Sequence, residues 1–241
     1  MLFGIEEELA FPDPHLADDD GLLAVGGDLS WERLLLAYNY GIFPWYGFKD
    51  EPILWWCPQQ RFVIFPDEIH ISHSMRQLMR SGKYLATINK AFDQVIECCG
   101  KTDERNTKQG AWLGGDMLAA YKEMHRREYA ASIEVWAYTE PDDERYADAY
   151  RDERFGTLVG GLYGILLSTT GNAKAAFNFF GESMFSIAPS ASKFALIKLS
   201  ELMANSGGLI DCQFETPHLK TMGGRHIPYD EYMTYLRGKD E

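Results

Sequence analysis

The sequence predicts an α+β fold with a mixed, mostly antiparallel sheet. Its 241 residues are 46% hydrophobic and 14% aromatic, which is enough for a core and suits one large domain or two unequal ones. Three strand-like runs with turn-rich connections follow one another at 132–138, 157–168 and 175–186, so antiparallel pairing is expected. A helix at 190–208 then leads to a strand at 209–214, and this crossover predicts a strand parallel to its neighbour.

The N-terminal part of the chain is expected to contain a helix and an aromatic loop. Ser30 is a good N-cap and Gly41 a common helix stop, so residues 30–41 are predicted to be helical. The segment 41–58 is rich in tryptophan and is interrupted by prolines, which predicts a loop with short extended pieces.

A strand is expected at 61–65 because the apolar run there stops at Pro66. We place a domain boundary at this strand. The two predicted domains are a small N-terminal domain, residues 1–62, and a larger domain, residues 63–241.

The larger domain alternates helices and strands. Apolar residues spaced three and four apart predict helices at 72–82, 90–100, 115–128 and 229–238. A short strand is expected at 84–88, and the polar, acidic segment 139–156 is predicted to be a solvent-exposed excursion between two strands. Acetyltransferases that use acetyl-coenzyme A share this order of elements, so by analogy the larger domain is expected to be acetyltransferase-like (GNAT-like).

The formal net charge of −13 argues against a general nucleic-acid binder, whose surface is usually basic. A local basic patch is still compatible with this charge. Arg76, Arg80 and Lys83 are spaced four and three residues apart, so they are expected to form one stripe on the helix 72–82. A stripe without acidic residues suits contact with phosphates, and the alternative is an ordinary solvated helix face.

The sequence indicates neither a membrane protein nor an exported one. Residues 1–14 are acidic and lack the apolar run of a signal peptide, and no apolar segment approaches the ~20 residues that span a bilayer. The cysteines lack paired zinc spacing, so we expect no metal site, no disulfide scaffold and a cytoplasmic location. These cysteines are Cys57, Cys98, Cys99 and Cys212.

Two polar clusters on strands are candidates for catalysis. Asp211 and Gln213 share one face of the strand 209–214, because strand side chains alternate between faces. Glu182 and Met184 share a face near the end of the preceding strand for the same reason. Two carboxylates and an amide on neighbouring strand ends suit a catalytic cleft.

Each carboxylate also has a structural interpretation. Burying an ionised carboxylate among apolar neighbours costs several kcal/mol unless it is paired. Asp211 would then cap the loop 214–218, and Glu182 would pair with Lys193 or Arg225. The structural interpretation is favoured for either residue alone, whereas the two together favour a site.

Two tryptophans lie in predicted loops. Trp45 follows a proline in a turn-rich stretch, and Trp112 is flanked by glycine-containing sequence. Aromatic side chains in loops can stack on a nucleobase. The alternative is that both belong to the core, as most tryptophans do.

Ten short motifs occur along the chain in a distinctive order. They are GLLAVGGDLS, YGIFPWY, EPILWWCP, HISHSMR, AFDQVI, SIEVW, LVGGLYG, FFGESMFS, ASKFALIKL and LIDCQFETPHLKTMGGRHIP. Together they closely resemble the leucyl/phenylalanyl-tRNA–protein transferases of bacteria. The resemblance covers residues 11–236 and is specific because many motifs agree in order and spacing.

The resemblance implies an enzyme that moves leucine or phenylalanine from aminoacyl-tRNA to the N-terminal amine of proteins beginning with arginine or lysine. The product would be a degradation signal of the bacterial N-end pathway. The implied fold is a small N-terminal domain followed by an acetyltransferase-like catalytic domain. No metal and no soluble cofactor are implied, because the donor ester is already activated.

Roles for the polar residues also follow from the resemblance. Asp211 and Gln213 match the family's catalytic pair, and Asp211 is expected to take the proton of the attacking amine. Glu182 matches an active-site glutamate that supplies negative charge for a cationic acceptor. Met184 matches a pocket wall, and Leu162 is expected to join it in an apolar slot for leucine, phenylalanine or methionine.

The substrate's nucleic-acid part is assigned in the same way. Trp45 and Trp112 match the residues that sandwich the terminal adenine. The tRNA-binding basic cluster corresponds to Arg76, Arg80 and Lys83.

The sequence departs from the family pattern in a few places that bear on specificity. Leu162 stands where methionine is common, GAWLGG replaces the more usual TWIT, and the segments 139–156 and 169–180 are extended. Two alternatives remain at this stage. One is an acyltransferase that uses acyl-coenzyme A, which is disfavoured because no glycine-rich turn opens the helix at 190. The other is a silent module that binds N-termini or tRNA.

Overall fold

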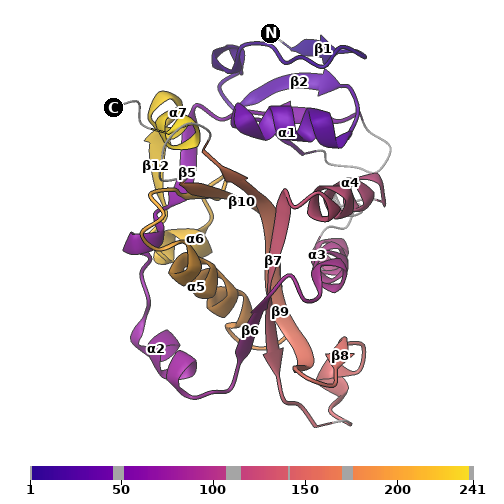
Figure 1. The fold of residues 1–241 in the computed structure, drawn as a ribbon, viewed down its shortest axis with the longest axis vertical. Coiled ribbons are helices and arrows are strands. Elements are labelled where there is room, and N and C mark those ends of the chain that lie inside the picture. Colours follow the sequence, from indigo (N-terminus) through magenta and orange to yellow (C-terminus); the bar gives the residue numbers. More distant parts are fainter. Residues whose placement is uncertain (1, 46–51, 107–114, 141, 170–175, 239–241) are drawn as a thin grey trace.

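The computed structural model describes residues 2–45, 52–106, 115–140, 142–169 and 176–238. Within these residues the chain forms a small sheet with strand order β1-β2-β4-β3 and a large sheet with order β12-β5-β11-β10-β9-β7-β6, while β8 pairs with β9. The small sheet lies at the end of the molecule that holds the N-terminus (Figure 1).

The small sheet and one helix come from the N-terminal part of the chain. The strands are β1 (Phe3–Ile5), β2 (Leu22–Gly26), β3 (Phe43–Pro44) and β4 (Leu54–Trp56). Helix α1 (Trp31–Asn39) begins after Ser30, whose hydroxyl accepts a hydrogen bond from the Arg33 amide, so the predicted helix and its cap are confirmed. The short extended pieces expected within 41–58 are β3 and β4, whereas β1 and β2 were not predicted.

The large sheet is mixed and mostly antiparallel, as predicted. Its strands are β5 (Gln60–Ile64), β6 (Leu85–Ile88), β7 (Ala130–Ala137), β9 (Gly156–Ser168), β10 (Phe177–Ser186), β11 (Ile210–Asp211) and β12 (Arg225–Pro228). Strand β9 pairs antiparallel with both β7 and β10, and β11 pairs parallel with β10. Both expectations about strand direction are confirmed.

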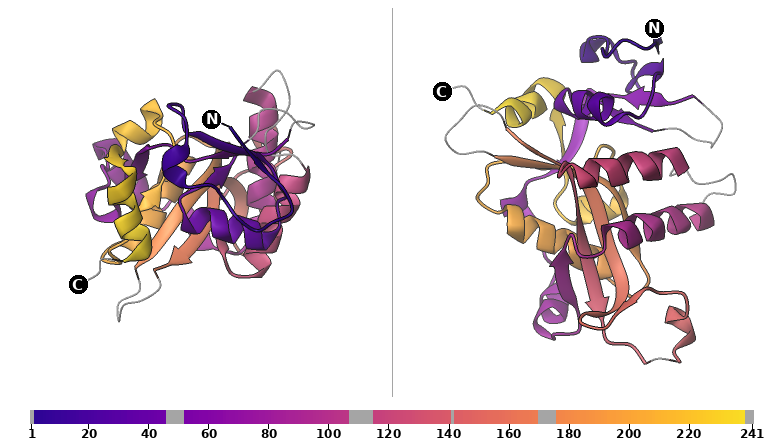
Figure 2. Two further views of the ribbon diagram at one scale, coloured as in Figure 1. Left: turned by 90° about the horizontal axis from the view of Figure 1, so that it is seen from above. Right: turned by 45° about the vertical axis from the view of Figure 1, so that its right-hand side comes forward.

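Helices cover both faces of the large sheet (Figure 2). They are α2 (His73–Arg80), α3 (Phe92–Asn106), α4 (Gly115–Arg126), α5 (Ala191–Met203), α6 (Pro217–Thr221) and α7 (Tyr229–Arg237). Helices α3 and α4 pack on one side of the central strands and α5 on the other. Among the described helices, none is both long and apolar enough to cross a bilayer.

The change from one sheet to the other falls between Trp56 and Gln60, so residue 62 lies inside β5. The two parts nevertheless share one buried core, since Tyr38 and Trp55 belong to the same apolar cluster as Phe180 of β10. The division into 1–62 and 63–241 remains a proposal about the chain's organisation.

The acidic excursion expected at 139–156 is only partly exposed. It contains a 3-10 turn (Glu144–Tyr146) and the short strand β8 (Arg151–Asp152), which pairs with the start of β9. Tyr146 is buried against the large sheet's core. Two further 3-10 turns, Pro14–Leu16 and Pro66–Glu68, occur elsewhere in the described residues.

Candidate active site

A cleft opens where strands β10 and β11 separate. The two strands pair at only two positions, Phe179 with Ile210 and Phe180 with Asp211. Immediately afterwards the pairing of β10 with β9 shifts register between Gly181 and Ser183, and such a bulge re-aims the extra side chain. That extra residue is Glu182, so the bulge sets the direction of the Glu182 side chain at the point where β10 and β11 separate.

The cleft contains a small, mainly apolar cavity of about 170 Å³. Four of the residues predicted from the sequence line it: Leu162, Glu182, Met184 and Gln213. Leu162 and Met184 are direct cross-strand neighbours on β9 and β10, so they form one wall. An apolar cavity of about 150 Å³ accepts a benzene molecule, so this cavity has the size for a leucine or phenylalanine side chain.

Glu182 is held by hydrogen bonds from both sides of the cleft. The Tyr121 hydroxyl donates to Oε2 at 2.6 Å, and Gln213 Nε2 donates to Oε1 at 3.3 Å. Behind Tyr121, the Tyr38 and Tyr121 hydroxyls lie 2.8 Å apart. Burial raises the pKa of Glu182 to about 7, against the opposing effect of the Tyr121 hydrogen bond.

The structural interpretation of Glu182 is wrong in its partners. Arg225 forms its ion pair with Glu68, and no ion pair joins Glu182 to Lys193 within the described part of the chain. The carboxylate is instead satisfied by neutral donors in a half-buried position on the cavity wall. Within the described part of the chain, Glu182 therefore lines the cavity without an ion-pair partner of its own.

Asp211 lies below the cleft and is fully buried. Arg61 Nη2 donates to its Oδ2 at 2.7 Å and Arg61 Nε to its Oδ1 at 2.9 Å, while the Tyr232 hydroxyl donates to Oδ2 at 2.7 Å. The carboxylate therefore faces its own ion pair, and Asp211 does not line the cavity.

The expected common face of Asp211 and Gln213 is not observed. Strand β11 ends at Asp211, and Gln213 has a left-handed backbone with φ of 55°. The Gln213 amide donates to Asp211 Oδ1 at 2.9 Å, which closes a tight turn. Asp211 thus caps a turn, although it is the turn at Gln213 rather than the loop 214–218.

Trp45 lies beside the cleft. Its ring centroid is 5.5 Å from that of Phe214, the residue after Gln213, and 5.9 Å from that of Trp56. The side chain is 42% exposed, so it is available to a ligand and is not a core residue. The other tryptophan predicted to contact the donor, Trp112, lies outside the described residues.

The predicted basic stripe is broken by the end of its helix. Arg76 and Arg80 are exposed on α2, but the helix ends at Arg80 with Ser81 as its C-cap. Lys83 is therefore not on the helix, and its ammonium lies 5.5 Å from the centroid of the Tyr84 ring. All three side chains are exposed, and α2 projects from the end of the molecule opposite the small sheet (Figure 1).

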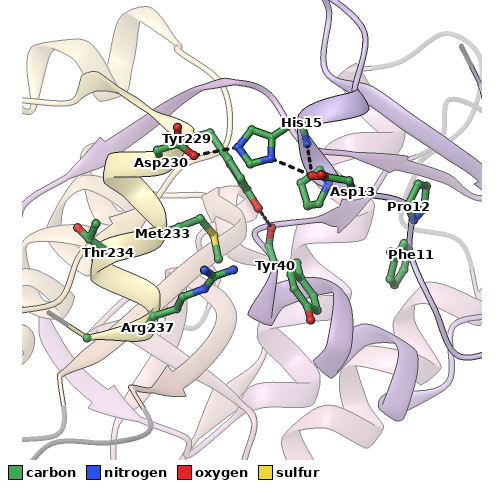
Figure 3. Close-up of a pocket in the computed structure, with 12 residues that line it drawn as sticks. Phe11, Pro12, Asp13, His15, Tyr40, Tyr229, Asp230, Met233, Thr234 and Arg237 are labelled. Carbon is green, nitrogen blue, oxygen red and sulfur yellow. Dashed lines mark hydrogen bonds and ion pairs between the residues drawn. The ribbon is translucent and has the colours of Figure 1, made fainter. Parts of the chain in front are cut away.

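A larger hollow of about 820 Å³ lies between the N-terminal segment and α7 (Figure 3). His15 bridges its two sides, with Nδ1 2.8 Å from Asp13 and Nε2 2.9 Å from Asp230. None of the predicted site residues that the structure describes lines this hollow. Its groups join two parts of the fold to each other, so we do not assign the reaction to it.

Four residues around the cleft were not predicted: Tyr38, Tyr121, Arg61 and Tyr232. Each contacts one of the two carboxylates or a residue that does. A general signal was present, because buried carboxylates require donors. The sequence does not reveal which of its 13 tyrosines and many basic residues supply them. Within the described residues, no three His, Cys, Asp or Glu side chains are grouped to hold a metal ion.

Two family models match the chain. The model described as leucyl/phenylalanyl-tRNA protein transferase matches residues 63–237. The model described as the N-terminal domain of leucyl/phenylalanyl-tRNA protein transferase matches residues 27–59.

Full-length relatives carry the same description. The leucyl/phenylalanyl-tRNA–protein transferase of Syntrophobacter fumaroxidans is 44% identical over 98% of this chain and 89% of its own length. That of Syntrophus aciditrophicus is 46% identical over 95% of this chain and 85% of its own, and that of Flavobacterium psychrophilum 41% over 97% and 98%.

The solved structures that match the chain are much more distant in sequence. A Trypanosoma brucei acetyltransferase is 13% identical with a TM-score of 0.34, over 56% of this chain and 84% of that one. An acetyltransferase from Pyrococcus furiosus is 12% identical with a TM-score of 0.30, over 66% and 93%.

Proposed function

Because this chain belongs to the leucyl/phenylalanyl-tRNA–protein transferase family and is accordingly a transferase, we propose that it moves leucine or phenylalanine from aminoacyl-tRNA to the N-terminal α-amine of proteins that begin with arginine or lysine. Methionine is a further donor side chain of suitable size. The product is a degradation signal of the N-end pathway, made in the cytoplasm.

The cavity at the split between β10 and β11 is the observation that carries this proposal. It is apolar, about 170 Å³ in volume, and closed at one side by Leu162 and Met184. An apolar donor side chain gains free energy by leaving water for such a cavity. A polar donor side chain against the apolar wall of Leu162 and Met184 would be desolvated without a hydrogen-bond partner.

The acceptor's charge fits the other side of the cavity. A protein that begins with arginine or lysine presents a cationic side chain next to its α-amine. Among the described residues that line the cavity, Glu182 supplies the carboxylate, and its hydrogen-bond partners there are neutral. An uncompensated carboxylate in a poorly solvated site attracts such a cation more strongly than the same group in water.

Placement of the two substrates supplies much of the rate. The donor ester is already activated, and the α-amine has an ordinary pKa of about 7.7–8.0, so about a tenth of it is in the reactive neutral form at pH 7. Holding the amine against the ester carbonyl converts a bimolecular reaction into one within a complex. Gln213, which the Asp211 turn fixes at the cavity, is placed to orient the amine.

Trp45 and the basic residues extend the proposed site to the tRNA. Trp45 stands exposed beside the cleft and offers a ring face to the terminal adenine. We propose Trp112 as its partner on the strength of the family resemblance. Arg76, Arg80 and Lys83 are the proposed contacts for phosphates of the tRNA body.

The experiment that tests the proposal is one incubation with labelled donor. Radiolabelled Leu-tRNA or Phe-tRNA is mixed with the protein and an acceptor that begins with arginine, and the same acceptor beginning with glycine serves as control. We expect label on the arginine acceptor only. Binding of donor and acceptor without transfer would mean a silent module, and acetyl-coenzyme A binding by calorimetry would favour an acyltransferase of another class.

A further inference from the structure

A chain of hydrogen bonds runs from the small N-terminal domain into the cavity. Tyr38 on α1 contacts Tyr121 on α4 at 2.8 Å, and Tyr121 contacts Glu182 on β10 at 2.6 Å. Gln213 completes the chain on the other oxygen of Glu182. Helix α1, helix α4 and the turn after β11 are far apart in sequence, and this chain connects all three to the carboxylate of Glu182.

The direction of this chain follows from counting protons. A tyrosine hydroxyl carries one proton, and an ionised carboxylate can only accept. Tyr121 uses its hydroxyl proton in the hydrogen bond to Glu182. The Tyr121 oxygen therefore accepts the hydrogen bond that the Tyr38 hydroxyl donates. Both donors point the same way, toward Glu182, which favours the ionised form of that carboxylate.

The two carboxylates near the cleft are in different situations. Asp211 is fully buried, and its oxygens already accept hydrogen bonds from Arg61, Tyr232 and the Gln213 amide. Protonating it would leave the buried Arg61 guanidinium without its counter-charge, which is costly. Glu182 lines the cavity, and in the described part of the chain its hydrogen bonds come from neutral groups, so it can gain and lose a proton beside the substrate.

We propose that Glu182, rather than Asp211, accepts the proton of the acceptor amine, and that Tyr121 and Tyr38 are positioning residues that hold its carboxylate at the cavity. This inference rests on the proposed transfer reaction. The neutral amine attacks the ester carbonyl, so that a C–N bond forms. Glu182 takes the proton released from nitrogen and returns it to the ribose oxygen as the C–O ester bond breaks. The carboxylate is restored at the end of the turnover.

The electrostatic surroundings suit this role. The pKa of about 7 brings Glu182 near the pKa of an α-amine, which is where a general base is effective. The charged groups near it are Asp211, which raises its pKa, and Arg61, which lowers it. Burial raises the pKa of Tyr38 and of Tyr121 well above the usual value, so both remain protonated donors throughout the working range.

The test is the pH dependence of transfer at saturating donor and acceptor, with spontaneous hydrolysis of the donor subtracted. In the wild type, Glu182 must be ionised and the acceptor amine must be neutral for transfer. The logarithm of the rate should therefore rise with pH with a slope of about two on the acid side. Glu182→Gln keeps the shape of the side chain and should lower the rate at least about a hundredfold. Its remaining pH dependence should have a slope of about one, from the amine alone.

Tyr121→Phe separates positioning from a purely structural role. Removing its hydroxyl takes away a hydrogen bond that lowers the pKa of Glu182. The acid side of the profile should then move to higher pH by about one to two units, and the rate should approach that of the wild type at about pH 9. Tyr84→Phe is the matched control, since it removes a buried hydroxyl that donates to Pro189 away from the cavity.

The outcomes distinguish this inference from the function on which it rests. Absence of transfer by the wild type overturns both. A Glu182→Gln protein with the wild-type rate and profile overturns the inference and leaves the transferase function intact. A Tyr121→Phe protein that is slower by the same factor at every pH contradicts the positioning role.

Discussion

Arg61 and Asp211 form an ion pair in which both side chains are fully buried. The pair joins β5 to β11, and the Arg61 guanidinium also lies 4.7 Å from the Phe43 ring centroid and 5.0 Å from that of Tyr232. It therefore connects the small sheet, the large sheet and α7 at one point beneath the cleft. Asp211 of this pair also accepts a hydrogen bond from the Gln213 amide, so the pair anchors the turn at Gln213.

Asp211→Asn is expected to destabilise the protein, because it leaves the Arg61 charge buried without a counter-charge. Breaking one partner of a buried pair costs about 3–5 kcal/mol of unfolding free energy. Transfer should fall as well, since the turn at Gln213 loses its anchor. Urea unfolding measures the first effect. The pair of Glu68 with Arg225, in which both side chains are exposed, supplies the control, as Glu68→Gln should leave the unfolding midpoint nearly unchanged.

An Asp211→Asn protein with the stability of the wild type and no activity would reverse this assignment. It would mean that the carboxylate acts on the reaction itself, as expected from the family resemblance. The two roles are thus separated by measuring stability and transfer on the same preparation.

The long elements of the large sheet were predictable because local periodicity determines them. The runs that became β7, β9 and β10 are long and apolar, and the crossover helix α5 then requires β11 to be parallel to β10. The strands β1 and β2 were not predictable, since each is short and is stabilised by pairing with residues distant in sequence.

The sequence brought four candidate residues to one place in the fold, but it did not predict how they are arranged there. Glu182, Met184, Leu162 and Gln213 do share one cavity. Simple alternation failed at Gln213, because the strand stops two residues earlier and the backbone turns left-handed. It also could not reveal that Asp211 faces Arg61, since the partner is 150 residues away and its burial is a tertiary effect.

Trp45→Ala should weaken donor binding by about 1–3 kcal/mol, the usual contribution of one base–aromatic stack. The side chain is already 42% exposed, so its loss should cost little folding stability. Donor affinity is measured by titration, and folding by circular dichroism. Tyr138→Ala, which removes an aromatic ring that is 84% exposed, is the control. An equal loss of fold and affinity in Trp45→Ala would indicate a core residue.

Met184→Phe should change which donor is preferred. Met184 forms one wall of the cavity together with its cross-strand neighbour Leu162, and a larger ring there reduces the space for the donor side chain. Phenylalanine should then be transferred less well relative to leucine, by about 10–200-fold for a change of this size. The ratio of kcat/KM for Phe-tRNA and Leu-tRNA measures it. An unchanged ratio would place the donor side chain in another cavity.

His15 should make part of the stability depend on pH. Neutral imidazole has one N–H and can donate to only one carboxylate, whereas His15 lies between Asp230 and Asp13 (Figure 3). The hydrogen bonds that the protonated ring donates to Asp230 and to Asp13 raise the pKa of His15, with the Asp230 bond the larger cause. Its contribution is therefore complete below the unfolded pKa of about 6.5 and is lost as pH rises through the raised folded value.

Melting temperatures of the wild type and of His15→Ala, measured across a range of pH, test the direction of this effect. His15→Ala should be less stable than the wild type below about pH 6.5, and the difference should shrink at alkaline pH. His73→Ala, which changes an exposed histidine on α2, is the control. A difference that grows at alkaline pH would contradict the bridging role of the protonated ring.

The basic cluster on and after α2 should control how this acidic protein holds tRNA. With 36 acidic against 23 basic residues, the overall field repels a polyanion, so binding relies on a local patch and on the aminoacyl end. If Arg76, Arg80 and Lys83 neutralise about three phosphates, the slope of log affinity against log salt should be roughly −2 to −3. Replacing all three by alanine should flatten that slope and raise the apparent KM for aminoacyl-tRNA. Transfer from a short aminoacyl-adenosine should be nearly unchanged, because that donor has no phosphates.

Since Lys83 lies beyond the helix end and beside the Tyr84 ring, its single replacement should affect the slope independently of Arg76 and Arg80. A triple variant with the wild-type slope would show that the cluster is an ordinary solvated surface.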